Sequence, residues 1–467
     1  MLFNSWQFLL FFTIVFILYL FLNHRWQNRL LLVTSYAFYA LWDWRFLFLI
    51  WFVTGINYWC GTKILGSKPR AKKAFLIAGI SANLLVLGFF KYCDFFIENF
   101  VQLISLFGLS PSIHTLSIIL PIGISFFTFK AISYVVDIYR GDFAPVGDFF
   151  DFALYIAFFP ELLAGPIDRA GRLLSQIAAP RVFNLDRFLE GCFLIVWGLY
   201  LKVFIADNLA LIVNPIFEES TYIGSRVLTG IYGFTFQILC DFAGYSYMAM
   251  GLGRVMGFDL INNFRQPYFS TNPREFWQRW HISLSTWLRD YLYIPMGGSR
   301  KGSLMTYRNL GLTMLLGGLW HGASWTFVIW GGYHGLLLMI YRFAEPFLSK
   351  LKEPGSVLMR RIWYWMRVIF FFQFISLGWL FFRAKSIGQA SSMIRALISP
   401  STLYFNGTSI LFFVFVLLVV EYIQYKKDDL FAPLTWRPVV QIILYLVILF
   451  SLLLMGVKGE EFIYQQF

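Results

Sequence analysis

The stretch Asn309–Tyr341, "NLGLTMLLGGLWHGASWTFVIWGGYHGLLLMIY", runs for 33 residues without an Asp, Glu, Lys or Arg. A helix that crosses the hydrocarbon core of a bilayer needs roughly 20 mostly apolar residues. Comparable uncharged runs recur from one end of the chain to the other: Ser5–His24, Phe46–Thr62, Ala74–Phe90, Asn99–Phe129, Val368–Phe382, Ala396–Val420 and Pro438–Val457. With the weaker runs included, the sequence predicts an all-α polytopic membrane protein with about 10 to 13 spanning or re-entrant helices.

The composition of the whole chain supports the same fold class. Of its 467 residues, 58% are apolar and only 13% are charged, whereas soluble domains carry about 25% charged residues. The first apolar run has no basic stretch before it and no small-residue cleavage site after it, so we expect a retained helix and not a cleaved signal. No linker rich in Pro, Gly or Ser interrupts the chain, and we expect one integral membrane domain over residues 1–467.

The net charge of +13 has two interpretations. In a soluble protein it would suggest a nucleic-acid partner, but in a membrane protein Lys and Arg gather in the cytoplasmic loops. The segment Arg254–Arg308 holds eight Lys and Arg against three Asp and Glu, a net of +5. We therefore expect this segment to be cytoplasmic or interfacial, with the lipid bilayer and not nucleic acid as the partner of the basic residues.

The same basic segment contains Phe276–Arg300, "FWQRWHISLSTWLRDYLYIPMGGSR". Thr271 or Asn272 can cap a helix that has Pro273 at its first position. Its apolar face would carry Trp277, Trp280, Leu284, Trp287 and Leu288, and its opposite face Arg274, Gln278, Ser285 and Arg289. The pattern predicts an amphipathic helix at the membrane interface or in a cytoplasmic mouth of the protein, ended by the glycines of "PMGGSRKGS".

Three of the five histidines lie where chemistry is conceivable. His321 interrupts the uncharged run, and an ionisable side chain inside such a run is costly and a candidate for function. A buried neutral imidazole can accept a proton from a hydroxyl, and the small residues Gly317, Gly318, Gly322 and Ala323 leave room for a substrate or a neighbouring helix. The alternative is a buried histidine bonded to a backbone carbonyl. His281 is either a second functional histidine or an interfacial polar residue, and for His334 a packing role is favoured.

Several other kinds of site find no support in the sequence. The four cysteines are scattered without a CxxC pair, which suggests neither a zinc site nor a disulfide framework. GxSxG, P-loop and HExxH motifs do not occur in the chain. We expect no metal and no permanently bound cofactor. Breaks at Pro121, Gly123, Pro160, Gly165 and Pro166 indicate irregular backbone, which is tolerated at membrane depth only beside protein or a water-filled cavity.

The blocks around the two histidines, with "ILPIGISFFTFKAISYVVDIYRGD", "FFPELLAGPIDR", "CDFAGYSYMAMGLGRVMGF" and the terminal "GEEFIYQQF", resemble the membrane-bound O-acyltransferase (MBOAT) family. The resemblance covers nearly the whole chain and is strongest to the bacterial branch that O-acetylates polysaccharides. It implies helices around a central funnel, with cytoplasmic acetyl-CoA as the acyl donor. His321 would be the catalytic base and His281 the second signature position. The substrate-binding residues would be Trp280, Trp320, Ser285, Arg279, Arg289, Arg300 and Lys301.

The resemblance also implies partners and a location. The protein would be a multi-pass protein of the bacterial inner membrane, working with a periplasmic SGNH-type acetyltransferase and a polysaccharide synthesis and secretion complex. Alginate is the first choice of polymer, and cellulose or another exopolysaccharide the second. Peptidoglycan O-acetylation and teichoic acid D-alanylation are alternatives. A transporter or flippase is a rival of another class, although we see neither an intramembrane Asp/Glu relay nor an internal repeat. A membrane scaffold for a secretion complex is a third interpretation.

Overall fold

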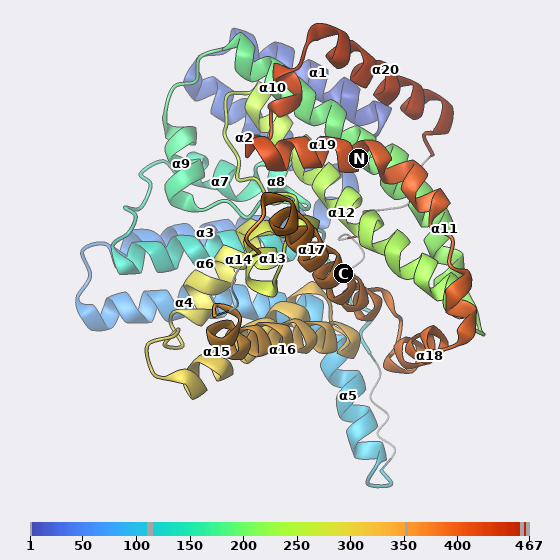
Figure 1. Ribbon diagram of the computed structural model, residues 1–467. Helices are drawn as coiled ribbons and strands as arrows, with labels where there is room; N and C mark the ends of the chain where they lie inside the picture. Colours follow the sequence, from blue (N-terminus) through green and yellow to red (C-terminus); the bar gives the residue numbers. More distant parts are fainter. Residues whose placement is uncertain (1, 110–114, 351–353, 458–461, 464–467) are drawn as a thin grey trace. The chain divides into compact units, whose positions relative to one another are not determined.

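The computed structural model describes residues 2–109, 115–350, 354–457, 462 and 463. These residues form helices and no strands (Figure 1), which confirms the predicted fold class. Seven helical segments of the described chain are long and apolar enough to cross a membrane: His24–Ile64, Pro69–Ser105, Leu185–Glu218, Gly224–Val255, Val357–Arg383, Thr408–Lys427 and Pro438–Met455. The protein is therefore a multi-pass membrane protein.

Contacts divide the chain into two compact units, residues 1–195 with 248–261 and residues 196–247 with 262–467. Two of the three boundaries fall inside α10 (Leu185–Leu199) and α12 (Gly224–Val255), and the third follows Ile261. The basic segment Arg254–Arg308 is divided too, since its first eight residues belong to the first unit. The single domain expected from the sequence stays a prediction.

The first unit contains the elements up to the start of α10. They are α1 (Trp6–Phe21), α2 (His24–Asp43), η1 (Trp44–Phe46), α3 (Leu47–Ile64), α4 (Pro69–Leu87), η2 (Gly88–Tyr92), α5 (Cys93–Ser105), α6 (Ile124–Arg140), α7 (Phe149–Ala157), α8 (Phe159–Leu162) and α9 (Ala170–Ala178). The breaks predicted at proline and glycine are present. Gly123 precedes α6 with a φ of 77°, and a Cβ there would lie 2.0 Å from the carbonyl oxygen of Leu162. Only glycine fits this turn, so the close contact between the two segments depends on it.

The second unit carries the histidines. Its elements are η3 (Tyr200–Ala206), α11 (Asp207–Glu218), most of α12, η4 (Pro267–Phe269), α13 (Pro273–Arg279), α14 (Ile282–Leu288), η5 (Arg289–Tyr293), α15 (Ser303–His321), α16 (Trp325–Leu348), α17 (Val357–Arg383), α18 (Ile387–Leu397), η6 (Pro400–Tyr404), α19 (Thr408–Lys427), η7 (Ala432–Thr435) and α20 (Pro438–Met455). Inside this unit the buried Lys202 Nζ lies 2.8 Å from Asp207 and 2.7 Å from Asp241. A buried cation is tolerated when carboxylates pair with it in this way.

The amphipathic helix predicted after Asn272 begins as expected but is not continuous. The Asn272 side chain accepts a hydrogen bond from the Glu275 amide at 2.9 Å, and α13 then ends at Arg279. His281 has a φ of 43°, in the left-handed region, so the helical hydrogen bonds cannot run through it. α14 starts at Ile282 and passes into the π-helical turn η5. Periodicity alone does not reveal a left-handed residue, and the prediction of one helix was wrong at this point.

Candidate active site

The α15–α16 hairpin places His321 through close helix packing. A Cβ on Gly318 would lie 2.3 Å from the carbonyl oxygen of Phe327, and one on Gly331 would lie 2.3 Å from that of Met314. These two glycines therefore let the backbones of the helices touch, as small residues do in membrane helix pairs. His321 is the last residue of α15. Of the small residues near it, Gly318 makes room for the neighbouring helix, not for a substrate.

His281 is placed by a turn that a neighbouring segment holds. The amide of Ile282 donates to the Asn263 carbonyl at 3.1 Å, and the amide of Ser283 donates to Asn263 Oδ1 at 3.2 Å. The amide of Arg265 donates back to the Arg279 carbonyl at 3.0 Å. Asn263 is fully buried. The sequence analysis missed this residue because nothing in its local pattern shows which distant amides it binds.

The α15–α16 hairpin and the turn between α13 and α14 bring the predicted histidines together. The ring centroids of His281 and His321 are 6.5 Å apart, and both side chains are buried. Trp320 contacts both rings, with centroid distances of 5.9 Å to His281 and 5.0 Å to His321. Phe242 meets His281 edge-on at 4.7 Å. Burial lowers the pKa of His281 to about 3, so its imidazole is neutral at physiological pH.

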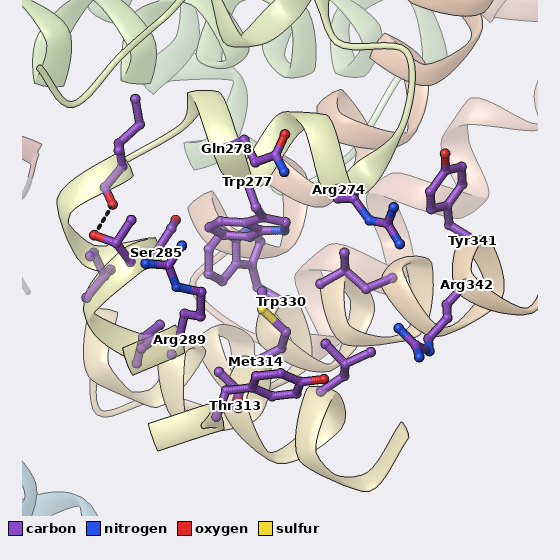
Figure 2. Close-up of a pocket in the computed structure, with 18 of the residues that line it drawn as sticks. Arg274, Trp277, Gln278, Ser285, Arg289, Thr313, Met314, Trp330, Tyr341 and Arg342 are labelled. Atoms are coloured by element: carbon purple, nitrogen blue, oxygen red, sulfur yellow. Dashed lines mark hydrogen bonds between the residues drawn. The ribbon is translucent and has the colours of Figure 1, made fainter. Parts of the chain in front are cut away.

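A cavity of about 440 Å³ opens beside His321. Its lining comes from α13, α14, η5, α15 and α16: Arg274, Trp277, Gln278, Ile282, Leu284, Ser285, Thr286, Leu288, Arg289, Tyr293, Leu310, Thr313, Met314, Gly317, His321, Trp330, Leu338, Tyr341 and Arg342. Figure 2 shows Trp277 and Trp330 in the middle of the cavity, with Arg274 and Arg342 on one side and Arg289 with Ser285 on the other. The cavity joins cationic side chains to a buried histidine.

This geometry agrees with what comparison with known proteins finds. Residues 146–383 match the model of MBOAT, the membrane-bound O-acyltransferase family. The chain is 44% identical over 405 residues to the probable alginate O-acetylase AlgI of Pseudomonas aeruginosa, covering 86% of this chain and 76% of that protein. The chain belongs to the membrane-bound O-acyltransferase family. It is an O-acyltransferase of the membrane.

Two further relatives show how widely the similarity extends. The peptidoglycan O-acetyltransferase of Helicobacter pylori is 36% identical over 409 residues, covering 81% of this chain and 74% of that protein. The teichoic acid D-alanyltransferase of Bacillus subtilis is 32% identical over 276 residues, covering 56% of this chain and 69% of that protein. The three relatives are named for O-acetylation of alginate, O-acetyl transfer to peptidoglycan and D-alanyl transfer to teichoic acid.

Within this O-acyltransferase, the predicted substrate-binding residues fall into two groups. Ser285 and Arg289 line the cavity, and Ser285 Oγ donates to the Trp280 carbonyl at 3.1 Å. Trp280, Trp320, Arg279, Arg300 and Lys301 do not belong to the lining. Trp280 is fully buried between Phe276 and Trp379. Their substrate-binding role stays a prediction.

The cationic residues outside the lining have other surroundings. Arg279 pairs with Glu275 at 3.1 Å and lies over the ring of Tyr425. Arg300 and Lys301 are exposed on the glycine-rich turn after η5. The Lys301 stem lies near Gly297, whose φ is 112°. For these three residues, proximity in sequence to the aromatic segment did not translate into proximity to the cavity.

The two faces that the sequence analysis assigned to one helix both contribute to the cavity. Trp277, Leu284 and Leu288 line it, and so do Arg274 and Gln278. The break at His281 changes the direction of the chain between α13 and α14. Residues from opposite faces of the expected helix are therefore brought to the same cavity.

The sequence analysis missed one cationic residue altogether. Arg342 lies directly after the uncharged run and lines the cavity from α16. Arg274 is held by Glu345 through two contacts of 2.7 and 2.8 Å, and Arg289 is held by Asp290 at 2.6 Å. Among the described residues Arg342 has no acidic partner. Its charge is the one most open to an anionic ligand, because the other two are already compensated.

His334 lies among aromatic side chains, two of which, Trp277 and Trp330, also line the cavity. Its ring contacts Trp330 at 4.8 Å and Trp277 at 5.2 Å, and it is fully buried. Neither ring nitrogen has a hydrogen-bond partner among the described residues. This setting fits the packing role favoured from the sequence.

The arrangement permits acid–base chemistry by histidine. His321 lines the cavity, and Trp330 meets its ring edge-on at 4.9 Å. Aromatic side chains around His321 limit the access of water, and a neutral imidazole can take a proton from a hydroxyl. Within the described ranges, no three His, Cys, Asp or Glu side chains gather to hold a metal ion.

Proposed function

We propose that this O-acyltransferase takes acetyl groups from cytoplasmic acetyl-CoA and passes them across the bacterial inner membrane for O-acetylation of an extracellular polysaccharide. Alginate is the polymer proposed first, and cellulose or another exopolysaccharide second. The observation that carries the proposal is the cavity itself. It joins cationic side chains, Arg342 above all, to His321, which lies 6.5 Å from His281 between ring centroids.

The donor has the chemistry that such a cavity would bind. Coenzyme A carries several phosphate charges at one end of a long arm and a thioester at the other. Guanidinium groups bind phosphate oxygens through charge-assisted hydrogen bonds. Arg342 would hold the phosphates, and the arm would run along Trp277 and Trp330. No coenzyme is expected to remain bound between turnovers, because it is a substrate.

The reaction follows from the position of His321. Its neutral imidazole takes the proton of the acceptor hydroxyl while the hydroxyl oxygen attacks the thioester carbonyl. A carbon–oxygen bond forms and the carbon–sulfur bond breaks. The sulfur leaves as a thiolate, which takes the proton from the imidazolium, so free coenzyme A and an O-acetyl ester are the products. His281 would hold the pantetheine arm or polarise the carbonyl.

The immediate acceptor would belong to a relay. We propose a periplasmic SGNH-type acetyltransferase as the protein that delivers the acetyl group to sugar hydroxyls. A polysaccharide synthesis and secretion complex would supply the polymer. The acceptor hydroxyl could lie on that partner, on a small accessory peptide or on the sugar.

A second candidate is peptidoglycan O-acetylation. It is favoured by the 36% identity to the Helicobacter pylori peptidoglycan O-acetyltransferase over 81% of this chain. Teichoic acid D-alanylation is less favoured, since the Bacillus subtilis relative covers only 56% of this chain. A transporter would not require the acyl-transfer chemistry for which these relatives are named.

The polymer can be tested in the cells that make this protein. The gene is replaced by one encoding His321→Ala, and ester-linked acetate is measured on secreted exopolysaccharide and on isolated peptidoglycan. The proposal predicts loss of acetate from exopolysaccharide with peptidoglycan acetate unchanged. Loss from peptidoglycan alone would support the second candidate, and acetate unchanged on both polymers, with the variant present in the membrane, would refute the proposal.

A further inference from the structure

Three aromatic side chains close the space next to His321. Phe382 from α17 meets the His321 ring at 5.4 Å, and Trp330 meets it at 4.9 Å. Phe382 also contacts Trp330 at 5.3 Å and Phe327 at 4.8 Å. Phe327, Trp330 and Phe382 are each at most 5% exposed. We call these three residues the aromatic wall.

The wall lies where the acyl group of a bound thioester would point. Arg342 and His321 both line the cavity, whereas Phe382 and Phe327 are not part of its lining; Phe382 contacts the lining residue Trp330, and Phe327 contacts Phe382. If the phosphates of the donor are held by arginine and its carbonyl is at His321, the acyl chain is the only part that extends past the histidine. It must then meet the aromatic wall, because the chain continues from the carbonyl away from the sulfur.

We propose that the aromatic wall restricts this O-acyltransferase to the acetyl group, and that Phe382 is the residue that sets the limit. This inference rests on the proposed function. Packed aromatic rings leave no space for added methylene groups, and protein interiors do not yield to them without strain. The methyl group of an acetyl thioester would lie against the rings, whereas each added methylene would have to displace a buried ring.

Phe382 is the position to change for a structural reason. Trp330 lines the cavity and belongs to the binding surface, and Phe327 fills the space that a side chain on Gly322 would need. Phe382 touches His321 without forming part of the lining. Removal of its ring therefore opens space beside the histidine while the surface that holds the donor arm stays in place.

The experiment compares donors of different length on one protein. Membrane vesicles carrying the full-length chain are mixed with periplasmic extract and polysaccharide from the cells that make this protein, so that an acceptor hydroxyl is present, and are supplied with acetyl-, propionyl- or butyryl-CoA. The released thiol is measured, with His321→Ala vesicles as the background. One methylene too many in a packed pocket costs about 10-fold to 200-fold in rate. We expect the wild type to prefer acetyl-CoA over butyryl-CoA by at least about 10-fold, and Phe382→Ala to reduce this preference by a similar factor.

Two further variants separate specificity from loss of packing. Phe382→Leu removes less of the core and should shift the preference toward propionyl-CoA. Phe371→Ala removes an equally buried ring from the same helix, about 16 Å earlier along its axis, and should leave the preference unchanged. Thermal unfolding of all variants shows how much each has lost in stability.

The outcomes test the aromatic wall and the proposed function separately. A gain of butyryl transfer in Phe382→Ala, or of propionyl transfer in Phe382→Leu, with neither gain in Phe371→Ala, supports the wall. Two results would overturn it. In the first, wild-type protein uses all three donors at equal rates. In the second, folded Phe382 variants lose the same fraction of activity with each of the three donors. Wild type that releases no thiol from acetyl-CoA above background would overturn the proposed function, and the wall with it.

Discussion

His321 ends a helix of 19 residues, whereas His281 lies in a two-residue break between helices of seven residues each. The first histidine is held by backbone contact between α15 and α16 at Gly318 and Gly331. The second is held by hydrogen bonds from its turn to Asn263. Regular packing of α15 against α16 therefore determines the position of His321. The position of His281 depends on its left-handed backbone, which is stabilised by hydrogen bonds to the segment around Asn263, earlier in the chain.

The site is therefore built from one regular helix pair and one interrupted helical segment. A helix end gives a side chain a fixed direction, because all preceding residues share one geometry. A broken segment can turn residues from two faces toward one cavity, which a continuous helix cannot do. The broken segment α13–α14–η5 and the α15–α16 hairpin thus contribute different things. The first brings two paired arginines to the cavity and places His281, which is not part of the lining, next to His321; the second brings His321 and Arg342 to the cavity.

Among variants of the broken segment, the largest effect is expected at His281, where the role of the side chain can be tested separately from that of the backbone. In His281→Gly the left-handed φ of 43° is retained without strain, because glycine adopts it freely. We expect a folded protein whose release of coenzyme A is about 100-fold slower, as when a group that polarises a carbonyl is removed. Measurement of release and of thermal unfolding checks both parts. Unchanged release would show that His281 serves only the turn.

The next effect concerns the hairpin. Alanine at Gly331 would place its Cβ 2.3 Å from the Met314 carbonyl oxygen, whereas at the adjacent Gly332 the nearest atom is a Leu315 methyl at 3.4 Å. Gly331→Ala must push α15 and α16 apart and should cost up to about 3 kcal/mol. Gly332→Ala should cost little. Equal melting temperatures for the two variants would contradict the backbone contact that positions His321.

The two regions also differ in the cationic side chains that they bring to the cavity. Arg342 on α16 has no acidic partner among the described residues, whereas Arg274 and Arg289 of the broken segment do. Arg342→Ala should raise the KM for acetyl-CoA by about 10-fold with little change in kcat, since one charge-assisted hydrogen bond contributes about 1.5 to 3 kcal/mol. Lys301→Ala is the matched control, because Lys301 lies on the exposed turn outside the cavity lining. Steady-state kinetics on both variants provides the test. A larger KM change for Lys301→Ala would move the phosphate site to the glycine-rich turn.

The smallest effect is expected at Asn263. Asn263→Ala removes the side-chain oxygen that accepts from the Ser283 amide, which should cost about 1 kcal/mol and slow coenzyme A release by misplacing His281. Asn262→Ala removes a local bond to the Phe264 amide instead and is the control. If both variants release coenzyme A at the wild-type rate, the hydrogen bond from the Ser283 amide to the Asn263 side chain is not needed to position His281.

The fold class and the two histidines could be predicted from the sequence. Long uncharged runs require helices in a membrane, and a histidine inside such a run stands out because its burial is costly. The resemblance to a known family added His281 as its partner, and the structure brings the two rings close together.

The details of the cavity could not be predicted in the same way. The break at His281 depends on hydrogen bonds to Asn263, which is distant in sequence, and periodicity carries no information about such pairs. Arg342 was overlooked because the charge-free run stops just before it. The cationic residues that did stand out, Arg279, Arg300 and Lys301, lie outside the lining, since neighbours in sequence need not face the same space.

In the proposed mechanism, His321 lines this cavity and acts as the general base. The test is thiol release from acetyl-CoA by vesicles that carry wild type, His321→Ala or His334→Phe, each mixed with periplasmic extract and polysaccharide from the cells that make this protein as the source of acceptor. Both histidines are buried and contact Trp330, so His334→Phe controls for the loss of a buried imidazole. General-base catalysis contributes about 100-fold to 10,000-fold. We predict a loss of that size in His321→Ala and near wild-type release in His334→Phe; equal release by wild type and a folded His321→Ala protein would contradict the account.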